Sequence, residues 1–417
     1  MGLDRVACTV GVAGVTGGGA GMLRVKKTVV ESMSRLCNAC IQPSDCGSPP
    51  SIRPCTQTTT AVSNARLRSV RVGMIMAASV NQGNKSGENA PMKLATYKDG
   101  SRDGQLLVVS RDLATAAFAS HIANRLQQVL DDWNYLSPQL QDVYDALNAG
   151  RARQSFPFDA MHCMAPLPRA YQHTSAVAFP CSADAMDVKP PEPPQTQLSG
   201  DGLLGPFDSV LCSSEALGID FEAEVAVVTG DVPMGATVDR ALDSVRLVML
   251  GNVFSLRSVL QGKPATAFSA VAITPDELGT AWVKGRAALP LQCTWNGRKV
   301  GLCDAGADMV FHFGHLIADL AKTRAVRAGS IVGSGAVRNL GVQKRGQWEW
   351  PNGYSSIADK RAMETLQSGQ PITDYLKDND TVRLEMKTRD GNSLFGAMEN
   401  EITLVEISLV QSAVQKS

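Results

Sequence analysis

The segment GIDFEAEVAVVTGD, residues 218–231, combines the pattern of a buried strand with three regularly spaced acids. In an extended chain successive side chains point to opposite faces, so Asp220, Glu222 and Glu224 share one face, and the apolar residues between Phe221 and Val227 share the other. One interpretation is the solvated face of an edge strand, because acidic residues are commonly exposed. The other is a cation site, since two carboxylates two residues apart can reach one Mg²⁺ or Ca²⁺. The apolar flanks favour the cation, because unpaired carboxylates against a core are costly.

Composition places few limits on the chain apart from its charge. The 417 residues are 44% hydrophobic, enough for a sizeable core and two or three domains. Forty basic and forty acidic side chains cancel, which argues against a nucleic-acid or membrane partner. Residues 1–91 hold ten basic and four acidic side chains, whereas the remainder holds 30 and 36. The first 91 residues therefore form a chemically distinct part.

Residues 1–91 lack sustained periodicity and predict an extension of low order. The pair Cys37 and Cys40, with Cys46 and Cys55 beyond, matches no common zinc spacing, so unpaired reduced thiols are the preferred interpretation. No segment has both the length and the hydrophobicity of a membrane span, and we expect a soluble protein. A cytoplasmic location is the first expectation; the acid-poor, Arg- and Ser-containing extension makes organelle targeting the alternative.

Regular structure begins at Met92. In residues 92–110, two runs of alternating apolar and polar side chains are separated by turn residues, which predicts a β-hairpin. Apolar residues at helical spacing predict one helix from Phe118 to Trp133 and a second over 137–147. Residues 188–205 are rich in Pro and Gly and predict no regular structure. Further strands are expected at 222–228, 267–273, 289–295 and 330–332, with a helix over 311–325 and a strand pair over 380–405. The pattern predicts an α+β fold rich in strands.

A series of segments in this order resembles the bacterial-type fumarylacetoacetate hydrolase family. Besides residues 218–231 they are MKLATYKDGSRDGQLLVVSRD (92–112), CMAPLPRAYQ (163–172), KPATAFSAVAITPDELG (263–279), LQCTWNGRKVGLCDAG (291–306), GSIVGSG (329–335) and GYSSIADKR (353–361). The resemblance implies a small N-terminal domain over 92–165, a C-terminal mixed β-roll or β-sandwich over 166–412 that carries the active site, and a homodimer. Residues 1–91 lie outside it.

The resemblance also implies an enzyme: a hydrolase that cleaves a carbon–carbon bond in a 1,3-diketo acid. Fumarylacetoacetate, the intermediate of tyrosine and phenylalanine catabolism, would give fumarate and acetoacetate. Glu222 and Glu224 would bind Mg²⁺ or Ca²⁺, with Asp220 in a supporting or structural role. Arg257 would orient the substrate and Lys263 would stabilise developing negative charge.

Several positions depart from the family pattern. Val253, in GNVFSLR, stands where the family has a third metal-binding aspartate, and the neighbouring Asn252 points to the opposite face unless the register shifts. Ala336 replaces a threonine that often contacts substrate, and the interval from Arg257 to Lys263 is short. The region after residue 172 also differs, although His173 is a candidate base there, and Asp184 or Asp187 a candidate ligand.

Three alternatives therefore stay open beside an active fumarylacetoacetase. The first is a non-catalytic or impaired dimeric relative with a degraded metal site. The second is an acylpyruvate hydrolase or oxaloacetate decarboxylase on the same scaffold. The third is an error in the gene sequence over 174–205 and 252–263. Elsewhere His312 and His315 have a spacing that suits a metal, but packing or capping of a helix is the preferred interpretation.

Overall fold

The computed structural model describes residues 90–180, 196–198 and 200–405. Residues 1–89 of the predicted extension, with its five cysteines, and the candidate ligands Asp184 and Asp187 lie outside these residues. The predicted hairpin is confirmed: β1 (Lys93–Tyr97) pairs antiparallel with β2 (Gln105–Val109), with Lys93 opposite Val109. Two further strands, β3 (Thr115–Phe118) and β4 (Phe156–Pro157), extend the sheet beyond β2.

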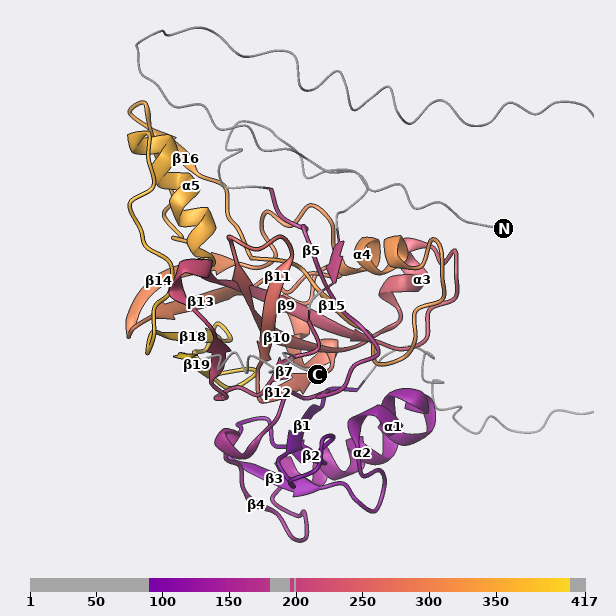
Figure 1. The fold of residues 1–417 in the computed structure, drawn as a ribbon. Helices are drawn as coiled ribbons and strands as arrows, with labels where there is room; N and C mark the ends of the chain where they lie inside the picture. The colour runs from indigo at the N-terminus through magenta and orange to yellow at the C-terminus, as the bar shows by residue number, and fades with distance from the viewer. Residues whose placement is uncertain (1–89, 181–195, 199, 406–417) are drawn as a thin grey trace, which may run out of the picture. The chain divides into compact units, whose positions relative to one another are not determined.

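Two helices follow these strands (Figure 1): α2 packs against β2 and β3, α1 packs against α2, and α1 is shorter than predicted. Phe118 ends β3, and α1 spans only Leu126–Asp131, so the expectation of a helix from residue 118 was wrong. Residues 118–125 fail to form a helix because the chain first completes a strand and its turn. The second helix, α2 (Trp133–Asn148), starts before the predicted residue 137 and holds Pro138 in its second turn.

The central sheet runs β4-β3-β2-β1-β12-β10-β9-β15-β5-β6, so the N-terminal strands continue into the rest of the fold. Its other members are β5 (His173–Ala176), β6 (Thr196–Leu198), β9 (Ile219–Thr229), β10 (Val245–Leu256), β12 (Val271–Ile273) and β15 (Ile331–Gly333). Off this path, β11 (Gly262–Phe268) pairs with β10, and β7 (Leu203–Leu204) pairs with β11. The short strands β6 and β7 correct the prediction that residues 188–205 lack regular structure. The acidic segment is β9, which is buried between β10 and β15, so its interpretation as a solvated edge strand was wrong.

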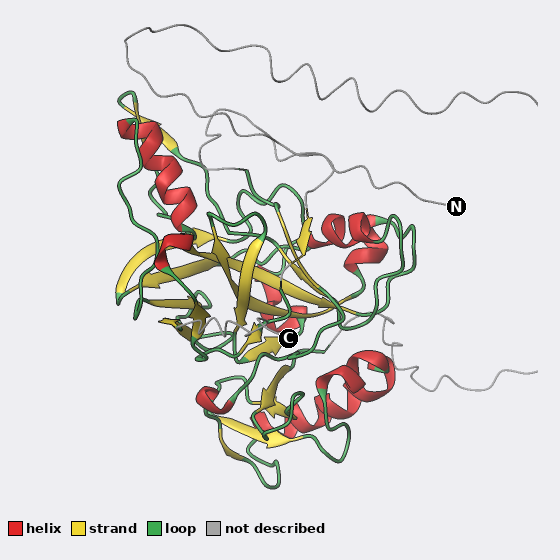
Figure 2. Cartoon of the chain, in the orientation of Figure 1, coloured by secondary structure: helices red, strands yellow, loops and turns green. Residues whose placement is uncertain are grey.

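A second sheet and three helices complete the described part of the chain (Figure 2). The strands of the second sheet lie in the order β14 (Arg298–Asp304), β13 (Pro290–Trp295), β18 (Thr381–Met386), β19 (Met398–Leu404) and β8 (Val210–Cys212). A small hairpin joins β16 (Val342–Lys344) to β17 (Gln347–Glu349). The helices are α3 (Val238–Leu242), α4 (Phe313–Leu320) and α5 (Ile357–Ser368). Most strand pairs are antiparallel and three are parallel, which confirms the predicted mixed α+β class.

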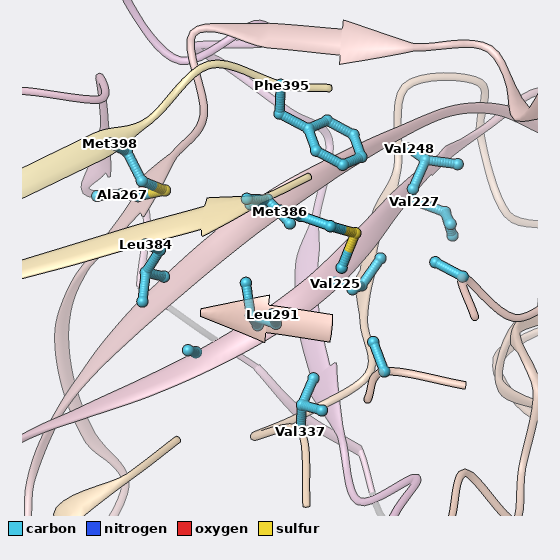
Figure 3. Close-up of a cluster of buried hydrophobic side chains, with 14 of the residues drawn as sticks. Val225, Val227, Val248, Ala267, Leu291, Val337, Leu384, Met386, Phe395 and Met398 are labelled. Carbon is cyan, nitrogen blue, oxygen red and sulfur yellow. The ribbon is translucent and has the colours of Figure 1, made fainter. Parts of the chain in front are cut away.

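Strand β9 is apolar on both faces along its second half. One face joins a hydrophobic cluster with β10 and the second sheet (Figure 3), in which Val225 and Val227 lie near Met386 and Phe395. The other face, from Ala226 to Val228, joins a second cluster with side chains of α1 and α2. The acids occupy this second face nearer the start of the strand, so they continue a buried stripe and do not meet solvent.

No helix among the described residues is both long and apolar enough to cross a membrane.

Candidate functional site

The three acids of β9 lie on one buried face and look across to β10. Asp220 is opposite Ser255, Glu222 is opposite Val253, and Glu224 is opposite Gly251. Asp220 and Glu224 are fully buried, and Glu222 is 9% exposed. Buried carboxylates require partners, because an unpaired charge in a protein interior is strongly unfavourable. The partners differ for each acid and define what each can do.

The contacts of Asp220 give it a structural role. Its carboxylate accepts hydrogen bonds from the backbone N–H groups of Ile357 (2.7 Å) and Ala358 (2.9 Å), the first residues of α5. It also accepts two from the guanidinium of Arg257, at 2.9 and 2.7 Å. Burial raises the pKa of Asp220 to about 6, although Arg257 opposes that effect. An acid at a helix N-terminus satisfies free N–H groups, so Asp220 anchors α5 to β9.

Glu222 is surrounded by donors and positive charge. Its Oε1 accepts a hydrogen bond from Ser255 Oγ at 2.7 Å and lies 2.8 Å from Arg257 Nη2. Lys263 Nζ, on β11, lies 3.9 Å from the other oxygen. Burial by itself would raise the pKa of Glu222, but Lys263 and Arg257 hold it below its usual value. Glu222 is therefore ionised and already neutralised by protein cations.

Glu224 is enclosed by backbone and small residues. Its Oε2 accepts hydrogen bonds from Ser175 Oγ (2.7 Å) and from the N–H of Gly335 (2.8 Å). A Cβ at Gly333 would collide with the carboxylate of Glu224, so a larger residue there would require that carboxylate to move. Oε1 itself is buried without a hydrogen-bond partner. One oxygen of Glu224 is thus fixed and the other is free to accept a further ligand.

His173 lies beside that free oxygen. Its Nε2 is 3.6 Å from Glu224 Oε1, and neither ring nitrogen has a hydrogen-bond partner. The imidazole packs edge-on against the ring of Phe268, with centroids 5.3 Å apart, and the residue is 5% exposed. The parallel pairing of β5 with β15 brings His173 here from 51 residues away along the chain. Its role as a base remains a prediction, but its place beside the acid pair is established.

Val253 leaves the position across from Glu222 without a carboxylate. It is fully buried directly across from Glu222, where an acid could share an ion with the pair. Asn252 is opposite Ala223, so it points to the other face of the sheet, as its neighbouring position requires. Ser175 offers Glu224 a hydroxyl group without charge. A hydrocarbon side chain therefore stands across from Glu222, and a hydroxyl group stands beside Glu224.

The acid pair fits a divalent ion only as a weak site. No group of three His, Cys, Asp or Glu side chains is placed to hold a metal ion within the described ranges. The free oxygen of Glu224 and the ionised carboxylate of Glu222 are the two groups that would hold one. Mg²⁺ commonly keeps several waters and binds proteins through one or two carboxylates. The donor set thus suits a largely hydrated ion, and Arg257 and Lys263 would compete with it for Glu222.

Arg257 and Lys263 flank the acids at the two ends of a short turn between β10 and β11. The side chain of Arg257 is 32% exposed, and that of Lys263 is 9% exposed. The turn leaves Leu260, at its tip, 94% exposed. Ala336 follows Gly335 in the loop that supports Glu224, and its methyl group offers no hydrogen bond. Both cations reach the acids, while their contacts with substrate remain predictions.

His312 and His315 belong to a different part of the molecule. His312 is the N-cap of α4, because its Nδ1 accepts a hydrogen bond from the N–H of Gly314 at 3.1 Å. The two imidazole rings are 4.0 Å apart. Burial, with help from His315, lowers the pKa of His312 to about 4. The preferred interpretation of the pair as capping and packing is confirmed.

Sequence reasoning missed the polar groups that hold the acids. Ser255 lies on the same face as Glu222, and simple alternation along β10 from Val253 would have found it. Ser175 and Gly335 come from β5 and from the loop after β15, and no local pattern links them to β9. Cavities of about 550, 410 and 520 Å³ lie elsewhere on the described surface and include none of the acids.

Two family models match consecutive parts of the chain. Residues 92–169 match the fumarylacetoacetase N-terminal domain 2, and residues 170–403 match the fumarylacetoacetate (FAA) hydrolase C-terminal domain. No curated protein matches the chain.

Solved structures with the same fold include enzymes of several activities. A probable 2-hydroxyhepta-2,4-diene-1,7-dioate isomerase from Mycobacterium abscessus is 17% identical with a TM-score of 0.53, covering 76% of this chain and 99% of its own. Fumarylacetoacetate hydrolase from Exiguobacterium antarcticum is 14% identical with a TM-score of 0.52, covering 75% and 100%. Maleylpyruvate hydrolase from Sphingobium sp. SYK-6, in complex with manganese(II) and pyruvate, is 15% identical with a TM-score of 0.51, covering 76% and 100%. At these identities the similarity shows the fold, while the domain models carry the assignment: the chain belongs to the fumarylacetoacetate hydrolase family.

Proposed function

We propose that this protein hydrolyses a carbon–carbon bond in a 1,3-diketo acid, with fumarylacetoacetate as the first substrate to test. The observation that carries the proposal is the pair Glu222 and Glu224 on one buried face, with Lys263 and Arg257 beside it. Water would add to one carbonyl carbon, the bond to the central carbon would break, and the enolate released would take a proton. The products would be fumarate and acetoacetate.

Each charged group has a defined part in this proposal. Lys263, 9% exposed, would stabilise negative charge as it develops on a substrate oxygen. Arg257 is the more exposed cation and would bind a substrate carboxylate through charge-assisted hydrogen bonds. Glu222 and Glu224 would hold a divalent ion, which when bound would polarise the diketone and lower the cost of the enolate. We propose Mg²⁺ or Ca²⁺; the manganese of the maleylpyruvate hydrolase relative supports a divalent ion in general.

A second candidate function is a non-catalytic or impaired relative that keeps the fold. Val253 opposite Glu222, and the ion pairs that Arg257 and Lys263 make with that acid, favour it. A site neutralised by its own cations has less need of a metal. Solved structures with the same fold include a maleylpyruvate hydrolase and a probable isomerase. If the protein is an enzyme with another substrate, we propose acylpyruvate hydrolase or decarboxylase activity as the alternative. The homodimer, the tyrosine-catabolic role and the cellular location remain proposals.

The test is the loss of fumarylacetoacetate absorbance with the purified full-length chain, with added Mg²⁺, Ca²⁺ or Mn²⁺ and with a chelator. Ion-dependent turnover that Lys263→Met abolishes, and that Lys98→Met leaves unchanged, would support the hydrolase. Lys98 is a suitable control because it is 40% exposed and pairs with Asp208 instead of the acids. No turnover at any ion concentration would refute it and favour the non-catalytic relative.

A further inference from the structure

A cavity of about 520 Å³ lies away from the acid pair, among segments that are far apart in sequence. Its lining includes Lys93 of β1, Arg111 after β2, Glu277 of the 3-10 segment Pro275–Ala281, and Thr388, Asn392 and Ser393 of the turn after β18. Its volume falls within the range of about 300–1,000 Å³ common for small-molecule sites. We refer to it as the Lys93 cavity.

Lys93 is a buried cation with a single polar contact. It is 1% exposed, and its Nζ donates a hydrogen bond to the backbone oxygen of Leu394 at 2.7 Å. Across the described ranges no carboxylate lies within ion-pair distance of its Nζ, and Glu277 and Asp112 act on it only at longer range. An ammonium group removed from water without a directly paired carboxylate is costly, and an anion beside it would recover part of that cost.

The nearest acids of the cavity are already engaged by other donors. Glu277 Oε1 accepts hydrogen bonds from the hydroxyl of Tyr144 and from Arg111, whose Nη2 lies 3.2 Å away. Asp112 Oδ1 accepts from Ser110 Oγ at 2.6 Å and from the backbone N–H of Ala114 at 3.0 Å. Asp390 also lines the cavity, and in the described part of the chain no acidic side chain pairs directly with Lys93, whose one hydrogen bond goes to the Leu394 oxygen.

The turn after β18, next to the Leu394 oxygen that Lys93 contacts, supplies further hydrogen-bonding groups. Ser393 Oγ is buried and has no hydrogen-bond partner. Thr388 and Asn392 line the same wall and carry hydroxyl and amide groups. A polar cavity that holds a buried cation without a direct ion pair, and near it an unpaired hydroxyl, is suited to a small charged ligand that also accepts hydrogen bonds.

We propose that the Lys93 cavity is a binding site for a small organic anion, separate from the acid pair. Its carboxylate or phosphate group would pair with Lys93 and Arg111, and Ser393 would donate to another of its oxygens. Such a ligand would join β1 to the turn after β18. Binding would therefore stabilise the contact between the start and the end of the described fold.

The site has a pH dependence with a definite sign. Burial lowers the pKa of Lys93 to about 8, an effect that Glu277 and Asp112 oppose and Arg111 assists. Lys93 is thus mostly charged at pH 7 and mostly neutral at pH 9, so anion affinity falls by about tenfold between these values. The other charged or titratable groups facing the cavity are Arg111 and Asp112 after β2, Tyr144 of α2, Glu277, and Asp390 of the turn.

The experiment is isothermal titration calorimetry of the full-length chain with succinate and, separately, with inorganic phosphate, at pH 7 and pH 9. We expect binding at pH 7 that weakens about tenfold at pH 9 and at least tenfold in Lys93→Met, in line with the loss of a charge-assisted hydrogen bond. Lys98→Met, outside the cavity, serves as the matched control and should bind as the wild type does. Binding of succinate alone identifies a carboxylate ligand, and binding of phosphate alone identifies a phosphate ligand.

A second variant keeps the test decisive if Lys93→Met fails to fold. Arg111 is 62% exposed, so Arg111→Gln should fold normally and still weaken binding severalfold. Absence of binding by the wild type, or binding that neither variant weakens, would overturn the proposal.

Discussion

Replacement of Val253 by aspartate tests directly what the face opposite Glu222 can do. Val253 is fully buried, so Val253→Asp removes an apolar side chain whose burial contributes about 2 kcal/mol. It also places a third carboxylate across from Glu222, whose existing cations are already shared. An unpaired buried charge brings the total cost to about 3–5 kcal/mol in the absence of metal.

The assay is thermal unfolding in a chelator and in a millimolar concentration of Mn²⁺ or Mg²⁺. At about 2 °C per kcal/mol for a chain of this size, Val253→Asp should unfold about 6–10 °C below the wild type in chelator. An ion at a hundred times its dissociation constant would restore about 2.7 kcal/mol, or about 5 °C. The wild type, with two carboxylates, should shift much less with the same ion.

Val253→Asn is the matched control, because it has the shape of aspartate without the charge. It should lose stability in chelator and gain little from the ion. If the aspartate and asparagine variants respond equally to Mn²⁺, residue 253 does not face the ion position and the reasoning fails. If Val253→Asp is as stable as the wild type in chelator, the assumed burial of that position is wrong.

Three further predictions concern the groups around the acids and in α5. Arg257→Gln should destabilise the protein by about 3–5 kcal/mol, because it strips two buried carboxylates of their shared cation; an unchanged denaturant midpoint would contradict this. Gly333→Ala should cost several kcal/mol in urea unfolding, since the new Cβ would lie 2.2 Å from a carboxylate oxygen of Glu224; wild-type stability would show that β15 can move away. Burial would raise the pKa of Glu364, but hydrogen bonds from Thr373 and from two backbone amides lower it to about 2. The ionised carboxylate therefore contributes fully to stability above pH 4.5, and this contribution is lost as the pH falls towards 2. Glu364→Gln should flatten the pH dependence of Tm between these values, and parallel curves for the variant and the wild type would exclude this role.

The position of the acids could be predicted from sequence because strand alternation is local. The run from Asp220 to Val227 fixes two faces whatever the strand packs against, and the structure places the acids on one and the apolar residues on the other. The hairpin over 92–110 followed from turn residues between two alternating runs in the same way. The helix expected from Phe118 failed because a short apolar pattern fits both a strand end and a helix.

The sequence by itself therefore determined the family, the α+β class, the shared face of the acids and the absence of a carboxylate at Val253. The tertiary structure decided which groups surround that face: Arg257 between Asp220 and Glu222, Ser175 and His173 beside Glu224. It also decided that Lys93 is buried beside a cavity without a direct ion pair. Periodicity depends on neighbouring residues along one strand, whereas these contacts depend on the pairing of strands and loops from distant parts of the chain, which no local pattern encodes.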